Sequence, residues 1–383
     1  AVSVPEGLPL PRWADTLHEA VRQCAHLPVD EAGASQADAD RLSFLDAKEP
    51  FPFEEVLAPF VLLARRRCVA KAGDAYRLLC EEAHVSLQRS LLQTLTGYAV
   101  QALYLEFSIE RAMAQSPLER LLELAQEEDD RTRYQMFVEH MRQGGLAAFF
   151  QEYTVLARLL ATITDLWVEA TIEFLQRLAA DRPDMQQVFG CESGLGRVMS
   201  VQPSLSDAHR GRRQVIALAF ASGCIVVYKP KDLGTEEAYY RLLAWCNQRG
   251  VPLPLRVLKV LNRSSHGWVE FVEHEPCRDR EEAQRYYQRA GMLLCLIYAL
   301  EGTDCHYENL IASGEQPVLV DMETLMHHRP RQVDEGDGAR AQVLANEQVA
   351  HSVLRTGLLP SWQIHDDTRV AYDVSGLGGG EQE

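Results

Sequence analysis

Apolar residues recur every three or four positions through most of the first 190 residues, which is the period expected of amphipathic α-helices. This spacing predicts four helical segments, at residues 53–73, 82–115, 131–144 and 153–183. Residues that interrupt a helix mark their ends, at Gly73, Pro117, Gly144 to Gly145, and Arg182 to Pro183. Near residue 190 the pattern changes to shorter apolar runs, which predict strands.

Residues 214–231 predict a β-hairpin, because two apolar runs flank the turn-forming residues Ala221, Ser222 and Gly223. The second strand of this hairpin ends at Lys229. A helix is expected next, with Thr235 as its N-terminal cap.

Residues 257–276 predict two further strands joined by a turn near Ser264 to Gly267. A helix from residue 281 follows, and its apolar second half indicates burial. This helix delivers the chain to Asp304.

A polar loop follows, in which Asp304, His306 and Asn309 precede an apolar run that ends at Asp321. This order is typical of the phosphotransfer centre of a kinase-like C-lobe. Asn309 and Asp321 offer the oxygen ligands that Mg²⁺ prefers, so they are candidate metal ligands on the phosphates of ATP. Asp304 is the candidate acceptor of a hydroxyl proton. The alternative is a polar turn before a buried strand.

Lys229 lies 75 residues before Asp304, where kinase N-lobes keep a lysine that binds phosphate. In that plan Glu236 or Glu237, at the start of the following helix, pairs with the lysine. Both features also have ordinary structural explanations. A lysine at a strand edge protects against aggregation, and glutamates at a helix start complement the macrodipole.

Several sequence blocks together resemble the dehydratase region of class II lanthipeptide synthetases, the LanM-type enzymes. The resemblance runs from about residue 50 to the C-terminus and is densest between Ser206 and Leu325. The blocks, in chain order, are DAHRG, VVYKPKDL, GWVEFVEH, YYQRAGMLLCLIYALEGTDCHYENLIASGEQPVLVDMETL, SVLRTGLLP and DVSGLGG.

The resemblance implies that ATP phosphorylates serine and threonine hydroxyls of a precursor peptide, with leader and core, before phosphate is eliminated to leave dehydroalanine or dehydrobutyrine. It also implies an α+β fold similar to lipid kinases, with an added helical portion. The residues that match the family's phosphorylation site are Lys229, Asp304, His306, Asn309, Asp321 and, beside them, Glu323.

For elimination, the family pattern points to Asp207 and His209. A histidine titrates near neutrality and can act as acid or base, and the arginines that follow it suit a phosphate. The alternative is a solvated turn whose arginines face water. The family also uses an arginine and a threonine well downstream of the metal aspartate, and neither is assigned in this chain.

The expected organisation has three parts: a helical portion at residues 1–190, a small β-rich N-lobe at 191–272 and a helical C-lobe at 273–383. We expect this C-lobe to be incomplete in this chain, and the isolated chain to be poorly stable or inactive. The CHG-type signature of lanthipeptide cyclases does not occur in the sequence. A LanC-like cyclase domain is therefore expected to be missing from this chain.

Composition narrows the functional classes. A net charge of −17 disfavours nonspecific nucleic-acid binding, and no apolar run is long enough to span a membrane. Nine cysteines without CxxC pairs, together with the lack of a signal peptide, favour a cytoplasmic protein with access to ATP. Two other functions stay open: a peptide or small-molecule kinase without elimination, and a catalytically silent peptide-binding module.

Overall fold

The computed structural model describes residues 11–24, 42–114, 128–190, 194–327, 344–345, 348–364 and 371–378. It divides into two compact units, Ala1–Tyr228 and Lys229–Glu383. Both units combine helices with small antiparallel sheets, which confirms the expected α+β class. The predicted division into three parts stays a prediction. The described helices include none long and apolar enough to cross a membrane.

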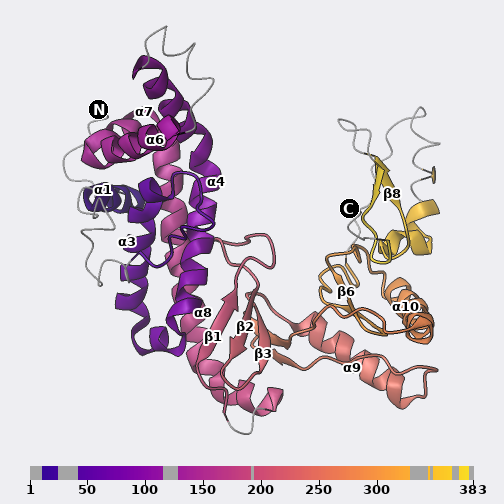
Figure 1. Ribbon diagram of the computed structural model, residues 1–383. Coiled ribbons are helices and arrows are strands. Elements are labelled where there is room, and N and C mark those ends of the chain that lie inside the picture. Colours follow the sequence, from indigo (N-terminus) through magenta and orange to yellow (C-terminus); the bar gives the residue numbers. More distant parts are fainter. Residues whose placement is uncertain are drawn as a thin grey trace. The chain divides into compact units, whose positions relative to one another are not determined.

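Helices dominate the first unit, where α3, α4 and α8 pack together along much of their length (Figure 1). The helical elements are α1 (Arg12–Cys24), α3 (Glu54–Ala72), η1 (Gly73–Leu78), α4 (Glu81–Ala114), α6 (Glu128–His140), η3 (Met141–Gly145), α7 (Leu146–Glu152) and α8 (Thr154–Phe189).

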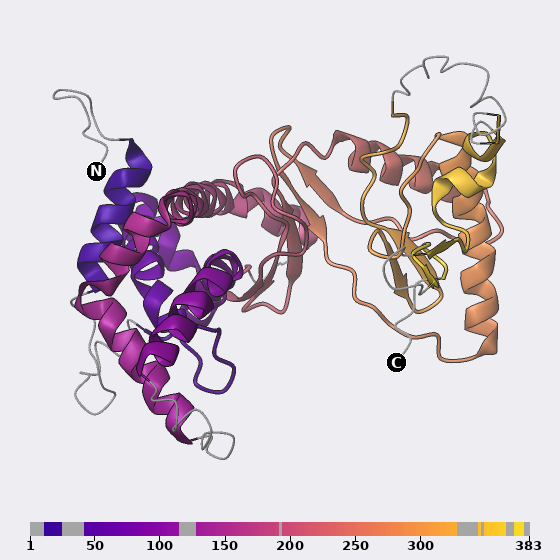
Figure 2. The same ribbon diagram turned by 90° about the horizontal axis from the view of Figure 1, so that it is seen from above.

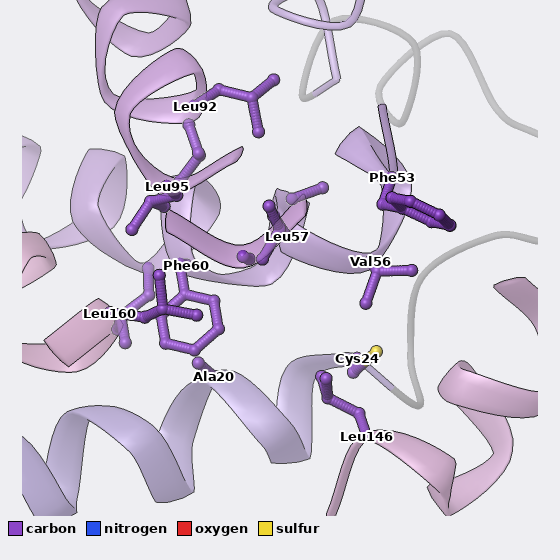
Figure 3. Packing of buried hydrophobic residues seen from close by; sticks show 14 of the residues in the cluster. Ala20, Cys24, Phe53, Val56, Leu57, Phe60, Leu92, Leu95, Leu146 and Leu160 are labelled. Carbon is purple, nitrogen blue, oxygen red and sulfur yellow. The ribbon is translucent and has the colours of Figure 1, made fainter. Parts of the chain in front are cut away.

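The core of the first unit is built from apolar side chains of several helices, and α3 is buried on all sides over residues 56–64. Leu57 and Phe60 of α3 lie among side chains from α1, α4, α7 and α8, and Figure 3 shows these side chains converging. Phe60 is fully buried and meets Phe150 edge to face, with ring centroids 6.0 Å apart. Burial of each such side chain stabilises the fold by about 2–3 kcal/mol.

The helix predictions are confirmed in position but not at every end. α8 continues through Pro183 to Phe189, so the predicted end at Arg182 to Pro183 is wrong. A proline inside a helix costs about 3 kcal/mol. Met185, two residues further on, is fully buried, and its burial offsets part of that cost. Gly190, with a φ of 76°, then ends the helix in the left-handed conformation that glycine tolerates.

Two other points concern the helical segments. The apolar pattern did not predict α1, a short helix that precedes the four predicted segments. Gly73 follows α3 as predicted, and Gly144 lies in a π-helical turn between α6 and α7. The predicted break at Pro117 lies outside the described residues.

Three antiparallel strands complete the first unit: β1 (Val198–Gln202), β2 (Ile216–Phe220) and β3 (Ile225–Lys229). The hairpin predicted at residues 214–231 is confirmed, with Ile216 opposite Tyr228. Its turn places Gly223 at a φ of 82°. Lys229, the last residue of β3, is the first residue of the second unit.

The described part of the second unit contains two longer helices and three pairs of short antiparallel strands. Its elements are α9 (Gly234–Gln248), β4 (Val260–Asn262), β5 (Gly267–Glu270), α10 (Arg280–Ala299), β6 (Leu310–Ser313), β7 (Gln316–Leu319), η4 (Val353–Thr356), β8 (Trp362–Ile364) and β9 (Ala371–Asp373). The predicted turn between β4 and β5 is confirmed, since the Arg263 amide donates to the His266 carbonyl at 2.8 Å.

A single apolar core joins α9, α10 and the hairpin of β6 and β7 in this unit. α10, the orange helix in Figure 2, packs against β7. Arg289 of α10 is 3% exposed and donates to the Glu315 carboxylate at 2.8 Å, so the hairpin turn is tied to the helix. The Tyr240 hydroxyl of α9 donates to the Leu319 carbonyl at 2.8 Å. The core therefore fixes the end of β7.

The predicted cap of α9 is wrong, because the helix begins at Gly234 and Thr235 already lies in its first turn. Side chains from two other positions satisfy the amides there. Asp232 accepts from the Gly234 amide at 2.8 Å, and Asn262 of β4 accepts from the Leu233 amide at 3.1 Å. A tertiary contact therefore does the work of a local cap.

Candidate active site

The polar loop after α10 has a tight internal structure. Asp304 adopts a φ of 63°, a left-handed conformation that is uncommon outside glycine. The Asn309 side-chain amide donates to the Asp304 carbonyl at 2.9 Å and lies 3.2 Å from Nε2 of His306. Oδ1 of Asp304 lies 3.5 Å from the same His306 nitrogen. The sequence-predicted Asp304, His306 and Asn309 are thus in mutual contact.

Two segments distant in sequence hold the backbone of this loop. The Cys305 amide donates to the Thr356 carbonyl at 2.8 Å, and the Tyr307 amide donates to the Val374 carbonyl at 3.2 Å. The loop therefore keeps its shape through contacts with the blocks SVLRTGLLP and DVSGLGG.

The hairpin of β6 and β7 brings Asn309 and Asp321 to the same end of two neighbouring strands. Leu310 pairs with Leu319, and the next step of the ladder is a 2.9 Å hydrogen bond from the Val320 amide to the Asn309 carbonyl. Asp321 follows Val320 directly. The predicted pair of metal ligands is therefore joined through one backbone contact.

Lys229 reaches the same place from the end of β3. Its ammonium donates to the carbonyl of Val320 and lies 3.7 Å from a carboxylate oxygen of Glu236, in the first turn of α9. Lys229 is 7% exposed and Glu236 is 3% exposed. Of the two candidate partners for the lysine, the structure brings Glu236 to it.

Lys231 lies beside the same residues, although it was not among the predicted site residues. Its ammonium donates to Asp321 at 2.9 Å and to Glu323 at 2.5 Å, and it lies 3.7 Å from Glu236. A usable signal was present in the sequence, because the two lysines of YKPK are two positions apart and side chains at that spacing leave an extended backbone on one side. We call Lys229, Lys231, Glu236, Asp321 and Glu323 the charge cluster.

The charge cluster shifts the pKa values of its members. Burial lowers the pKa of Lys229, against the opposing attraction of Glu236 and Asp321. Burial alone would raise the pKa of Asp321, but Lys229 and Lys231 outweigh it and hold that pKa below its usual value. Burial also disfavours the charge of Lys231, yet Asp321 and Glu323 raise its pKa. Asp321 is therefore ionised at neutral pH.

The donor set of this site suits a hard divalent cation. Asp321 and Glu323 supply carboxylate oxygens, and Asn309 uses its amide nitrogen on Asp304, which leaves its amide oxygen as the group able to bind a metal. One carboxylate oxygen of buried Glu236 accepts no hydrogen bond from the described residues. Among those residues, no three His, Cys, Asp or Glu side chains form a metal cluster by themselves. Mg²⁺ commonly binds one or two carboxylates and completes its shell with phosphates and water.

The chain matches the family described as "Domain of unknown function (DUF4135)" over residues 153–383, which is more than half of its length. The chain belongs to the DUF4135 family. The match covers every predicted site residue, from Asp207 to Glu323.

The chain is also 31% identical over 182 residues to the Lacticin 481/lactococcin biosynthesis protein LcnDR2 of Lactococcus lactis subsp. lactis. The aligned part is 45% of this chain and 19% of that protein, so the chain spans about a fifth of the length of this relative. This similarity confirms the predicted resemblance to class II lanthipeptide synthetases.

The two residues predicted for elimination belong to the first unit and form no part of the charge cluster. Asp207 and His209 are both exposed. His209 and Arg213 exchange two backbone hydrogen bonds of 2.9 Å, which close a tight loop. Arg213 is paired with Glu173 and Arg212 donates to Thr94, so these arginines are engaged within the protein.

A cavity of about 610 Å³ lies in the second unit beside the polar loop. Tyr307 and Glu308 of the loop form part of its lining, with Leu310 and Ala312 of β6. Tyr286 and Tyr287 of α10 complete an aromatic wall, with ring centroids 5.6 Å apart. The cavity therefore borders the polar loop at Tyr307 and Glu308.

Gly376 offers a test of how the polar loop is held. A Cβ added there would lie 2.5 Å from the Cys305 carbonyl oxygen, so Gly376→Ala must push the loop away from its support. We expect the Cys305 and Tyr307 amides to exchange hydrogen about tenfold faster in this variant. Hydrogen exchange followed by mass spectrometry measures the effect.

Gly291→Ala in α10 is the matched control, because a Cβ there meets no atom within 4 Å. Unchanged loop exchange in Gly376→Ala would contradict this description of the loop.

Proposed function

We propose that this chain supplies the dehydration activity of lanthipeptide maturation. It would phosphorylate serine and threonine side chains of a precursor peptide with ATP, and then eliminate the phosphate. The relative named for lacticin 481/lactococcin biosynthesis supports a role in lanthipeptide modification. The observation that carries the proposal is the convergence of Lys229, Asn309 and Asp321 on the backbone of Val320.

A kinase-like arrangement of the second unit supports the phosphorylation step. A lysine at the end of a strand, a helix glutamate 3.7 Å away, a polar loop and a hairpin that ends in an aspartate follow one another in the kinase order. We infer that this unit is built on the lipid-kinase plan. The γ-phosphoryl group would pass from ATP to the peptide hydroxyl oxygen, which breaks the bond to ADP.

The residues of the polar loop suit the proton transfer in this step. Asp304 is exposed and would accept the hydroxyl proton as the new P–O bond forms. His306 lies 3.5 Å from that carboxylate and would orient it. Lys229 would offset charge that develops on phosphate oxygens. Asn309, Asp321 and Glu323 would hold Mg²⁺, which when bound neutralises phosphate charge.

Elimination would follow on the phosphorylated side chain. A base removes the α-proton, the Cβ–O bond breaks and phosphate leaves, so that a Cα=Cβ double bond remains. We assign Asp207 and His209 to this step on the resemblance, which pairs them in the motif DAH. Their exposure is compatible with contact to a peptide.

The cavity beside the polar loop is the candidate site for the core peptide. Tyr307 and Glu308 of its lining belong to the same loop as Asp304, so a peptide bound in the cavity would lie beside the loop that carries the proposed proton acceptor. Its tyrosines present apolar rings with polar ends, a combination that suits an extended peptide. Tyr287 is 61% exposed and available to such a ligand.

Mass spectrometry of a lanthipeptide precursor treated with ATP, Mg²⁺ and the full-length protein tests the proposed reaction. We expect loss of water from serine or threonine residues. An Asp207→Ala variant should accumulate phosphorylated peptide, because it retains the proposed phosphorylation residues. Asp304→Ala should produce neither species at a comparable rate, with a loss of at least about 100-fold.

Two other outcomes of this experiment point to the alternative functions. Phosphorylated peptide without any loss of water in the unaltered chain would indicate a kinase alone. Absence of both ATP binding and peptide modification would refute the proposal and favour a binding module.

Tyr287→Ala tests the cavity. Loss of an exposed aromatic contact costs about 1–2 kcal/mol, so the KM for the peptide should rise about 5- to 30-fold while the KM for ATP is unchanged. Steady-state kinetics with each substrate varied in turn measures both constants. Trp245→Ala is the control, since this residue is 52% exposed in the same unit and does not line the cavity. An equal effect of both variants would contradict the assignment.

A further inference from the structure

The two lysines of the charge cluster occupy different environments. Lys229 has a side chain that is 9% exposed, and its ammonium is bound to the Val320 carbonyl. Lys231 has a side chain that is 22% exposed and makes no backbone contact through its ammonium among the described residues. Lys229 is therefore held in the interior, whereas Lys231 lies at the accessible margin of the same cluster.

The ammonium of Lys231 lies between two carboxylates that the proposed function gives to a divalent cation. It is 2.9 Å from Asp321 and 2.5 Å from Glu323, which are distances of charge-assisted hydrogen bonds. A cation bound by the same oxygens would have to displace it, because two positive charges cannot share one pair of carboxylates at such distances. Lys231 thus marks a cation-binding position within the cluster.

Displacement of Lys231 by a divalent cation would change the charge of the cluster. Two ammonium groups face three carboxylates in the cluster, which leaves one net negative charge. A divalent cation that replaces the Lys231 ammonium would leave the remaining cluster neutral, with Lys229 and the cation balancing the three carboxylates. A freed lysine on a flexible four-carbon stem would then favour the negative charge of a triphosphate.

We propose that Lys231 is a nucleotide-phosphate ligand that Asp321 and Glu323 hold in reserve until a divalent cation takes its place. The inference rests on the proposed ATP-dependent function. Lys229 holds the backbone of Val320 in addition to its proposed phosphate role, and Lys231 carries the exchangeable charge. This division of roles gives the site an ordered response, in which the cation and the nucleotide assist each other's binding.

Two binding measurements on the full chain test the exchange, and neither depends on turnover. Mn²⁺ binding without nucleotide, followed by electron paramagnetic resonance, should be at least about threefold tighter in Lys231→Met, because the competing ammonium is gone. Binding of a fluorescent ATP analogue with Mg²⁺ should be about tenfold or more weaker in the same variant. The opposite signs of the two effects identify an exchanged residue.

Lys259→Met is the matched control, because it removes the same charge from an exposed lysine outside the cluster. Lys231→Arg keeps the charge and should hold the ATP analogue within about threefold of the unaltered chain. Circular dichroism establishes that each variant is folded. If Lys231→Met is unfolded, Lys231→Arg provides the test. The proposal is overturned if Lys231→Arg binds the ATP analogue more tightly than the unaltered chain does, or if its arginine does not compete with Mn²⁺.

The binding measurements distinguish failure of the Lys231 exchange from failure of the proposed ATP-dependent function. If the unaltered chain binds Mn²⁺ and the ATP analogue, but Lys231→Met weakens both or changes neither, Lys231 is a fixed structural ion pair and the exchange is refuted. If the unaltered chain binds neither probe, the ATP-dependent function fails and the exchange fails with it.

Discussion

The backbone of Val320 is the point on which the candidate site depends. Its amide donates to the Asn309 carbonyl at 2.9 Å, and its carbonyl accepts from the ammonium of Lys229. Val320 therefore joins three segments: the end of β3, the polar loop and the end of the β6–β7 hairpin. If these hydrogen bonds were lost, Asn309 and Asp321 would no longer be held at the same end of the hairpin.

Electrostatics limits how the site can be built. Lys229 and Glu236 are almost fully buried, and two charges removed from water are costly unless they are paired. The cluster meets this requirement by placing carboxylates around both ammonium groups. It retains one net negative charge, so a divalent cation is a natural addition to it. A site that was already neutral would have had less affinity for such a cation.

Much of this arrangement could be predicted from the sequence, because its strongest patterns are local. Helical periodicity located α3, α4, α6 and α8, and the turn signal at Gly223 located the hairpin of β2 and β3. The order of Lys229, Asp304, Asn309 and Asp321 predicted a phosphotransfer site, and in the structure Lys229 and Asn309 both contact the backbone of Val320, next to Asp321.

What the sequence could not predict is non-local. α8 continues past Pro183 to a buried Met185, and Asn262 of β4 accepts a hydrogen bond from the Leu233 amide at the start of α9. The support that Thr356 and Val374 give to the polar loop joins residues about 50 and 70 positions apart. The role of Lys231 became visible only when its distances to Asp321 and Glu323 were known. Such contacts depend on packing rather than on local preference.

A crystal structure with Mn²⁺ and a non-hydrolysable ATP analogue would examine the account at the level of atoms. Anomalous scattering locates Mn²⁺ independently of the phosphate density. The account predicts a single strong anomalous peak within bonding distance of oxygen atoms of Asn309 and Asp321. A fully occupied Mn²⁺–nucleotide complex bound elsewhere, with Lys229 and Asp321 both remote from the phosphates, would contradict it.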